Sequence, residues 1–553
     1  MTNTEQADRP GDLPVAWLLF GAVTFAATAA LIPAVTVWLY SGHAPIASLP
    51  QLAVGTARII TRGAWADPAS AFPAQVAAQM PTATGWWAAT LRPVALTAAA
   101  VTAALRRLEP LAATNRLGRR PYDPRGRKPR SWARPRDLTP LIVPRPQPGR
   151  FTLGRVDRRL LASHPEAHVA VIAPTRSGKT TRCVIPWLLE HHGPAIVTST
   201  KTDILHATRA HRSTLGRVHV WDPFGPSSAG WTPLDGCRTW TGALQGAQWL
   251  SDAVTDGDSE VARYWRGEAA KLLAPLLHAA ALDQRRIDTV LNWLDGQETA
   301  TALRILEAHD ADDAARQLGA VTALDDRNRG TTYMSAGSLL AAYRYPEVTA
   351  SAHPELTPDA LLDGAPNTLY IVASERHQRL LTPLVVSLLS SVLHHAAAHA
   401  NTHGPLDPAL RVLIDEAANI APLRDLPGHL SQAAGYGIRI ATIWQSVAQI
   451  RERYHHAADS ILANSTTKLF MGPVTDEATR RYITTLLGDE TSDSADLKAS
   501  TQRSPRSEVK TFPRSKATAA ALQQLQPDRA LAIDGAQLPT LMILRPYWQG
   551  RPG

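Results

Sequence analysis

Cysteine is almost absent from this chain. The 553 residues include two cysteines, Cys183 and Cys237, and these show no spacing typical of metal ligands. They also cannot form the disulfide framework of a secreted domain, so we expect the bulk of the chain to fold in a reducing compartment. At this length a single ordinary domain is excluded, and about three or four units are expected.

Charge is absent from a long stretch near the N-terminus. Residues 13–40 contain no charged side chain, and a helix of this length, rising about 1.5 Å per residue, exceeds the ~30 Å hydrocarbon core of a bilayer. We therefore expect a transmembrane helix that follows a cytoplasmic N-terminus, residues 1–12. A cleaved signal peptide is the alternative, but the apolar run is too long and the flank before it is too acidic.

A second apolar stretch starts at Trp86 and reaches Leu105, and it is interrupted by Arg92. A long basic side chain two turns inside a membrane helix can extend back to the interface. We therefore expect a transmembrane hairpin over residues 13–105 with a short extracytoplasmic loop. An interfacial amphipathic segment is the alternative for the second stretch.

Basic residues dominate the next stretch. Between Arg106 and Arg150 there are 13 Lys or Arg and three acids, which predicts that this side of the membrane is cytoplasmic. Its prolines exclude a long helix: they include Pro121, Pro124, Pro129 and Pro135. We expect residues 106–150 to be a basic, Pro-rich linker on anionic lipid, with nucleic acid as the alternative ligand.

A phosphate-binding loop follows a predicted strand at residues 169–172. The loop comprises Ala173, Pro174, Thr175, Arg176, Ser177, Gly178, Lys179, Thr180 and Thr181. Backbone N–H groups at a helix N-terminus bind the phosphates of a nucleoside triphosphate, and Gly178 permits the tight curl that this requires. We expect Lys179 to reach the β- and γ-phosphates and Thr180 to bind Mg²⁺. Ala173 replaces the glycine that usually opens the pattern, and a chance Gly-Lys-Thr sequence is the alternative.

Two later strands also end in residues suited to this chemistry. The strand near residues 410–414 ends at Asp415 and Glu416; we expect Asp415 to hold a water on Mg²⁺ and Glu416 to polarise the attacking water. The strand at 438–443 leads to Gln445, which is expected to sense the γ-phosphate or orient water. The alternatives are solvated acids at a strand end and an ordinary surface glutamine.

The order of predicted elements indicates an α/β fold. Strands alternate with helical runs in residues 151–238 and 344–553, which is typical of a parallel, helix-covered sheet. Residues 239–343 instead show only Ala- and Leu-rich segments with helical spacing, such as 261–282 and 288–308. We expect this stretch to be an all-helical insertion.

Taken together, the motifs resemble those of the type IV secretion coupling proteins, the TraG/TraD-like ATPases of conjugative DNA transfer. The motifs are APTRSGKTT, IVTSTKTD, VWDP, LIDEAANI, IWQSVAQI and ILANSTTKLFMG, in this order. The resemblance implies a RecA-like P-loop motor that uses ATP and Mg²⁺ and forms a homo-hexamer. It also implies a multi-pass protein of the bacterial inner membrane with a cytoplasmic ATPase part. Its partners would be single-stranded DNA, a relaxase and the subunits of a type IV secretion channel.

The resemblance also leads us to expect an arginine that acts in the neighbouring subunit. Arg424, Arg439 and Arg480 are candidates, while residues 432–435, before Tyr436, lack the basic residue of the family pattern. Two other functions stay open. One is an FtsK-like pump for double-stranded DNA, and the other is a non-catalytic, nucleotide-binding membrane receptor for secreted proteins.

Overall fold

The computed structural model describes residues 49–78, 80–87, 132–253, 259–487 and 522–549. The chain divides into two compact units, Met1–Pro121 and Tyr122–Gly553. The predicted membrane helix at 13–40 lies outside the described residues, and so does most of the second predicted membrane stretch, 88–105.

The described part of the first unit is a small helical cluster between the two predicted membrane segments. Its elements are α2 (Leu49–Arg62), η1 (Pro68–Ala71) and α3 (Ala74–Ala77). Phe72 and Trp86 are buried together with ring centroids 5.8 Å apart. Trp87 stacks on Trp65 at 5.7 Å, and its indole N–H donates to the Trp65 carbonyl at 3.0 Å. Aromatic packing therefore gives the predicted extracytoplasmic loop a core of its own.

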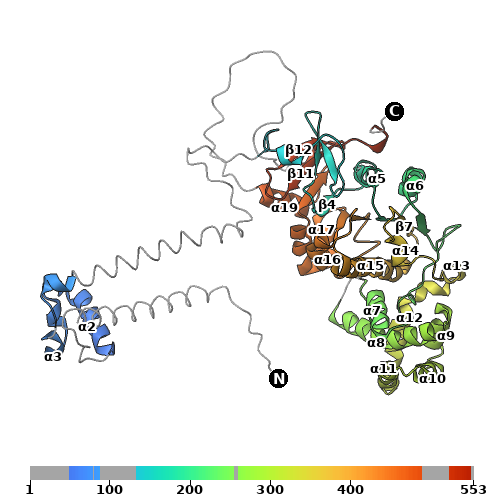
Figure 1. The fold of residues 1–553 in the computed structure, drawn as a ribbon, viewed down its shortest axis with the longest axis horizontal. Helices are drawn as coiled ribbons and strands as arrows, with labels where there is room; N and C mark the ends of the chain where they lie inside the picture. Colours follow the sequence, from blue (N-terminus) through green and yellow to red (C-terminus); the bar gives the residue numbers. More distant parts are fainter. Residues whose placement is uncertain (1–48, 79, 88–131, 254–258, 488–521, 550–553) are drawn as a thin grey trace, which may run out of the picture. The chain divides into compact units, whose positions relative to one another are not determined.

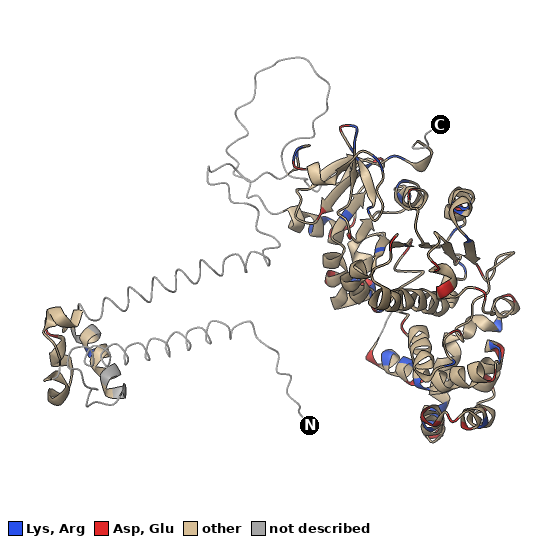
Figure 2. Cartoon of the chain, viewed as in Figure 1, with Lys and Arg blue, Asp and Glu red and all other residues tan. Residues whose placement is uncertain are grey.

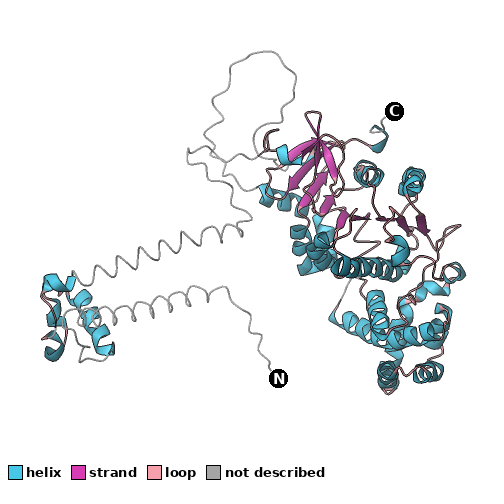
Figure 3. Ribbon diagram, viewed as in Figure 1, coloured by secondary structure: helices cyan, strands magenta, loops and turns pink. Residues whose placement is uncertain are grey.

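The second unit is built on a twelve-stranded sheet with the order β1-β3-β2-β12-β11-β10-β4-β9-β8-β5-β7-β6 (Figures 1 and 3). From β10 to β6 all neighbouring strands are parallel. These strands are β10 (Thr467–Met471), β4 (Val169–Ile172), β9 (Ile438–Trp444), β8 (Leu410–Ile414), β5 (Ala195–Ser199), β7 (Thr368–Val372) and β6 (Val218–Trp221). The prediction of a parallel sheet agrees with this part of the structure.

An antiparallel extension continues the sheet beyond β10. It comprises β11 (Arg529–Asp534), β12 (Thr540–Ile543), β2 (Thr152–Val156), β3 (Arg159–Ala162) and β1 (Ile142–Val143). Leu138, Leu141 and Val143 are buried beneath it, in and on either side of the short helix η3 (Thr139–Leu141). The sheet therefore begins before Phe151, and the C-terminal part of the stretch predicted as a linker packs into the fold because it carries apolar side chains between its charges.

Helices cover both faces of the parallel strands (Figure 1). Val169 and Val171 of β4 face α5 (Ile185–Leu189) and α6 (Asp203–Leu215), whereas Ala170 and Ile172 belong to the core beneath α15 (Gln378–His403). This alternation follows from the period of two along a strand. The helices α16 (Leu426–Gln432), α17 (Val447–Tyr454) and α18 (Ala458–Asn464) extend the second layer, and α19 (Glu477–Leu487) follows β10. The remaining short helices are η6 (Ala433–Tyr436), η7 (His455–Ala457) and η9 (Tyr547–Gln549).

Between β6 and β7 the described residues form only helices. They are α7 (Trp240–Ser251), α8 (Glu260–Leu282), α9 (Ile287–Asp295), α10 (Ala300–Ala308), α11 (Asp312–Thr322), α12 (Asp326–Leu339), η5 (Ala341–Arg344), α13 (Pro346–Ala350) and α14 (Pro358–Leu361). The single helical run expected at 288–308 is divided because Gly296 caps α9 and Gln297 takes a left-handed conformation, with φ 49°.

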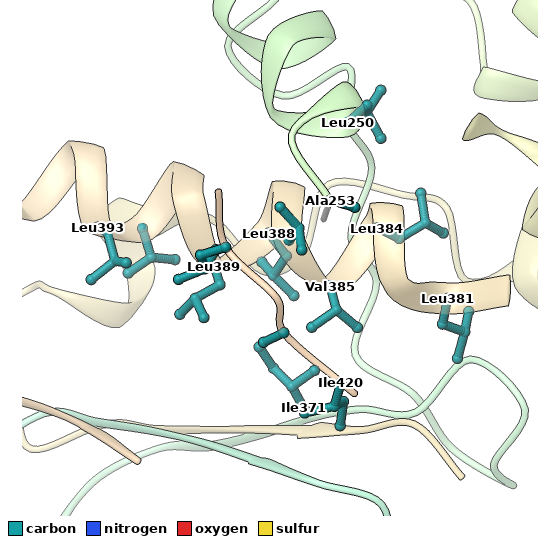
Figure 4. Packing of buried hydrophobic residues seen from close by; sticks show 14 of the residues in the cluster. Leu250, Ala253, Ile371, Leu381, Leu384, Val385, Leu388, Leu389, Leu393 and Ile420 are labelled. Atoms are coloured by element: carbon teal, nitrogen blue, oxygen red, sulfur yellow. The ribbon is translucent and has the colours of Figure 1, made fainter. Parts of the chain in front are cut away.

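Helix α15 joins the sheet to this helical part. Among the described residues it is the one helix long and apolar enough to cross a membrane, but 67% of its most apolar stretch is buried in the fold. Figure 4 shows it between Ile371 of the sheet and Leu250 and Ala253 at the end of α7. Charged residues gather on the outer helices, and Arg379 is the one Lys, Arg, Asp or Glu of α15 (Figure 2). Helix α15 is therefore a core helix that packs against both the sheet and the helical part.

This packing makes a stability prediction. Leu388, at the centre of α15, is completely buried, and the Leu388→Ala variant leaves a cavity between two layers. We expect a loss of about 2–5 kcal/mol of stability, seen as a lower midpoint of thermal unfolding. The matched control is Leu244→Ala on α7, whose side chain is exposed; equal midpoints for the two variants would contradict the prediction.

Candidate functional site

The three segments singled out in the sequence end side by side at one edge of the sheet. Strands β4, β9 and β8 are neighbours, with Ile172 opposite Trp444 and Ile414 opposite Thr442. Just beyond the strands, the Ala173 N–H donates to the Trp444 carbonyl at 2.9 Å. Ligands of open α/β sheets bind at the carboxyl ends of parallel strands, so this edge is where the site is expected.

The predicted phosphate loop, residues 173–181, connects β4 to the following helix. Gly178 has φ 81° and Arg176 has φ 62°, and these left-handed residues produce the sharp curl. The Ser177 hydroxyl donates to the Pro174 carbonyl at 2.8 Å, and the Thr181 hydroxyl donates to the Gly178 carbonyl at 3.2 Å. Residues 175 and 176 are exposed at the tip.

The chain turns into a helix directly after the loop. A π-helical turn, η4 (Thr180–Val184), runs directly into α5, so the helix starts at the loop itself and Pro186 lies inside this continuous run. The N–H groups of a helix start favour negative charge. The loop and this helix start together form an anion-binding geometry.

An ion pair connects the loop to β8. The Lys179 Nζ lies 2.8 Å from Glu416 Oε1, and both side chains are largely buried, with 10% and 18% exposed. The Gln445 amide donates to Glu416 Oε2 at 3.0 Å, and the Asn419 amide approaches the same oxygen at 3.4 Å. Glu416 also has φ 57°, a conformation that costs a glutamate free energy and is typical of functional sites. The structure thus brings all three residues predicted as catalytic, Lys179, Glu416 and Gln445, into contact.

Asp415 contacts Thr180, the residue after the loop lysine. The Thr180 hydroxyl donates to Asp415 Oδ2 at 3.2 Å, while Oδ1 is buried without a hydrogen-bond partner. Burial raises the pKa of Asp415 to about 6; Lys179 lowers it and Glu416 raises it further. A threonine hydroxyl beside a buried, unpartnered carboxylate oxygen is a set of hard oxygen donors that fits Mg²⁺.

The three arginines considered for the neighbouring subunit have different surroundings. The Arg424 Nη1 lies 3.6 Å from Asp252 Oδ1, with which it forms an ion pair. Arg439 is the second residue of β9, at the opposite end of that strand from Gln445, and its Nη1 donates to the Ala434 carbonyl at 2.8 Å. Arg480 lies on α19.

Three residues near the loop were given no role on the basis of the sequence. Gly472 follows β10 with φ 66°, and a Cβ there would lie 3.0 Å from the Ser177 Cβ. Gly472 ends the ILANSTTKLFMG motif, but it was given no role because nothing in the sequence reveals that β10 neighbours β4. Asn419 lies within LIDEAANI and Arg182 directly follows APTRSGKTT, so their positions in the sequence were the available signal.

The family model for type IV secretory system conjugative DNA transfer matches residues 138–537. The chain belongs to this family. The predicted resemblance to TraG/TraD-like coupling proteins is thereby confirmed. The matched range covers the sheet from η3 to β11 and includes every residue of the site described above.

Curated relatives in the family include conjugal transfer proteins named TraG. One from Escherichia coli is 28% identical over 340 residues, which are 55% of this chain and 52% of the relative. Another from Agrobacterium fabrum (strain C58) is 25% identical over 348 residues, which are 60% of this chain and 52% of the relative. The chain thus spans about half the length of the curated relatives it matches.

Solved structures of the bacterial conjugative coupling protein TrwB share the fold. The unbound form has a TM-score of 0.52 at 17% identity and covers 71% of this chain and 88% of its own. The complex with the ATP analogue ADPNP has a TM-score of 0.51 at 19% identity and covers 69% and 86%. A further TrwB structure contains ADP and Mg²⁺, with a TM-score of 0.51. The chain therefore shares the fold of these coupling proteins, and the α/β fold predicted from the sequence, with a largely parallel, helix-covered sheet, is confirmed.

The environment of Asp415 makes a prediction about stability. Because its pKa is higher in the folded protein than in the unfolded chain, the charged carboxylate reduces stability at pH 7. This loss of stability shrinks as the pH falls below the folded-state pKa of about 6, and it vanishes below the pKa of Asp415 in the unfolded chain. We expect Asp415→Asn to raise the free energy of unfolding of the nucleotide-free protein at pH 7, by up to about 3 kcal/mol.

Thermal unfolding at pH 7 and pH 5 measures this effect. The stabilisation by Asp415→Asn is expected to be smaller at pH 5, where the native carboxyl is protonated. The control is Asp157→Asn in the exposed turn between β2 and β3. An Asp415→Asn protein that unfolds at or below the temperature of the parent at pH 7 would disprove the explanation.

Proposed function

We propose that this protein is a Mg²⁺-dependent ATPase that drives conjugative DNA transfer. The observation that carries the proposal is the convergence of Lys179, Glu416 and Gln445 from three adjacent strand ends. A phosphate loop, a strand-end carboxylate and a water-orienting amide are the parts that P-loop hydrolases require. The nucleotide and Mg²⁺ in the TrwB structures support the same assignment.

In the proposed mechanism the loop backbone and Lys179 hold the β- and γ-phosphates. The triphosphate competes with Glu416 for Lys179, because both are anions and the lysine lies in a largely buried site. Glu416, once released from the lysine, polarises the attacking water, and Gln445 orients that water together with the carboxylate. Thr180 and Asp415 would hold Mg²⁺, which would supply positive charge to neutralise the phosphates.

The wider function rests on the family and on the sequence. We assign residues 13–105 to a membrane hairpin, 106–137 to a basic connecting stretch, 138–238 and 344–553 to the motor, and 239–343 to its helical part. A homo-hexamer at the bacterial inner membrane would pass single-stranded DNA, with an attached relaxase, into a type IV secretion channel. One arginine among Arg424, Arg439 and Arg480 would act on the nucleotide of the neighbouring subunit. The support is the family match, the names of the relatives and the basic excess next to the predicted hairpin.

Removal of the loop lysine tests the enzymatic part. We expect Lys179→Ala to abolish ATP hydrolysis and to weaken nucleotide binding, because the phosphates lose their cation. Glu416→Gln should retain binding and lose hydrolysis by about 10²-fold or more, because an amide is a poor general base. Steady-state hydrolysis and equilibrium nucleotide binding of the purified full-length protein measure both. Full conjugative transfer by a Glu416→Gln strain would favour the non-catalytic receptor instead.

The nature of the nucleic acid is tested separately. We expect single-stranded DNA to stimulate hydrolysis more than the same sequence as a duplex, and we expect the stimulation to weaken with salt, because phosphate contacts release counterions. Titration of hydrolysis with both substrates at two salt concentrations is the measurement. Greater stimulation by the duplex would favour an FtsK-like pump.

A further inference from the structure

The Arg182 side chain lies next to the phosphate loop. Arg182 is the third residue after Lys179, in the π-helical turn, and its backbone N–H donates to the Gly178 carbonyl at 2.9 Å. The side chain folds back over Gly178: a Cβ added at Gly178 would collide with Nη1 and would lie 3.1 Å from Cζ. The guanidinium thus occupies the space left free by the missing side chain of the loop glycine.

No described residue accepts a hydrogen bond from this guanidinium or forms an ion pair with it. Its Nε is completely buried and has no acceptor in the part of the chain that the structure covers. A buried, unsatisfied donor costs free energy, and more so when it belongs to a charged group. The guanidinium is therefore a charged group for which a bound anion would be a favourable partner.

The charges of the site indicate what that anion is. Lys179 is already engaged by Glu416, and Asp415 lies beside them. Apart from the exposed Arg176 at the tip, the cation of the loop region that is not engaged by a carboxylate is Arg182. An arginine fork matches adjacent phosphate oxygens, which accept two parallel hydrogen bonds from it.

We propose that Arg182 is a nucleotide-binding residue whose guanidinium contacts the α- and β-phosphates of the bound nucleoside triphosphate. The inference rests on the proposed function. In the proposed mechanism Lys179 and Thr180 serve the γ-phosphate end and Mg²⁺, beside Glu416 and Asp415. Arg182 instead lies over Gly178, where the curled loop backbone would hold the inner phosphates. Arg182 accordingly contributes to holding ADP as well as ATP.

This assignment separates binding from chemistry. A cation on the inner phosphates stabilises the bound nucleotide before and during hydrolysis alike, so its loss raises KM and leaves kcat nearly unchanged. An arginine on the γ-phosphate would instead lower kcat and would have little effect on ADP. The ratio of ADP to ATP affinity therefore distinguishes the two positions.

The test uses Arg182→Gln in the full-length protein. The measured quantities are the dissociation constants of fluorescent ADP and ATP analogues in the presence of Mg²⁺, and the kcat and KM of ATP hydrolysis. We expect both dissociation constants and KM to rise about tenfold or more, the size of one charge-assisted contact, with kcat within about twofold. Arg182→Lys keeps the positive charge without the guanidinium fork, so its dissociation constants and KM should lie between those of the parent and of Arg182→Gln. If Arg182→Gln does not fold, Arg182→Lys provides the test.

Arg209→Gln is the matched control. Arg209 is an exposed arginine on α6, a helix on the same face of the sheet as α5, and its removal should leave all four quantities unchanged. Unchanged ADP and ATP affinities in folded Arg182 variants would overturn the inference and leave the proposed ATPase intact. So would a loss of kcat with unchanged ADP affinity. Absence of nucleotide binding by the unmodified protein would overturn the proposed function and this inference with it.

Discussion

The ion pair between Lys179 and Glu416 is the contact on which the site depends. It joins a loop after β4 to a residue after β8, and these strands are separated in the sheet only by β9. Because both groups are largely buried, removing either one leaves an uncompensated charge. A triphosphate that takes over Lys179 supplies a replacement anion and leaves Glu416 free. In the proposed mechanism, the same interaction therefore holds the Glu416 carboxylate in place until the triphosphate releases it.

The segment after Glu416 extends this site toward the helical part. The Ala417 N–H donates to the Ile443 carbonyl at 3.1 Å, so the first residue after the acid is fixed to β9. Ile420 then packs beneath α15 near Val385 (Figure 4), and Leu423 forms a β-bridge with Ala253, just beyond α7. One short stretch of chain thus connects the Glu416 carboxylate, the core helix and the end of the first helix of the insertion.

The sequence predicted the elements whose signals are local. Buried strands such as β5 and β8 read as apolar runs that end in polar residues, and the loop at 173–181 has a fixed spacing. The elements that the sequence did not predict depend on tertiary contacts. The antiparallel strands β11 and β12 depend on pairing with β10, and Leu138 and Leu141 are buried by β-strands later in the chain despite their basic surroundings. Gly472 approaches Ser177 only because β10 lies beside β4.

The two neighbouring acids of β8 show how one strand end gives two carboxylates different properties. Asp415 is the more deeply buried, and its pKa is raised to about 6 because desolvation outweighs the attraction of Lys179. The left-handed φ of Glu416 turns the backbone out of the strand path, and the Glu416 carboxylate contacts the Lys179 amine. Had both residues continued the strand with alternating faces, they would have pointed to opposite sides of the sheet. The unfavourable conformation of Glu416 is therefore what places both carboxylates beside the same loop, one toward the Thr180 hydroxyl and one toward the Lys179 amine.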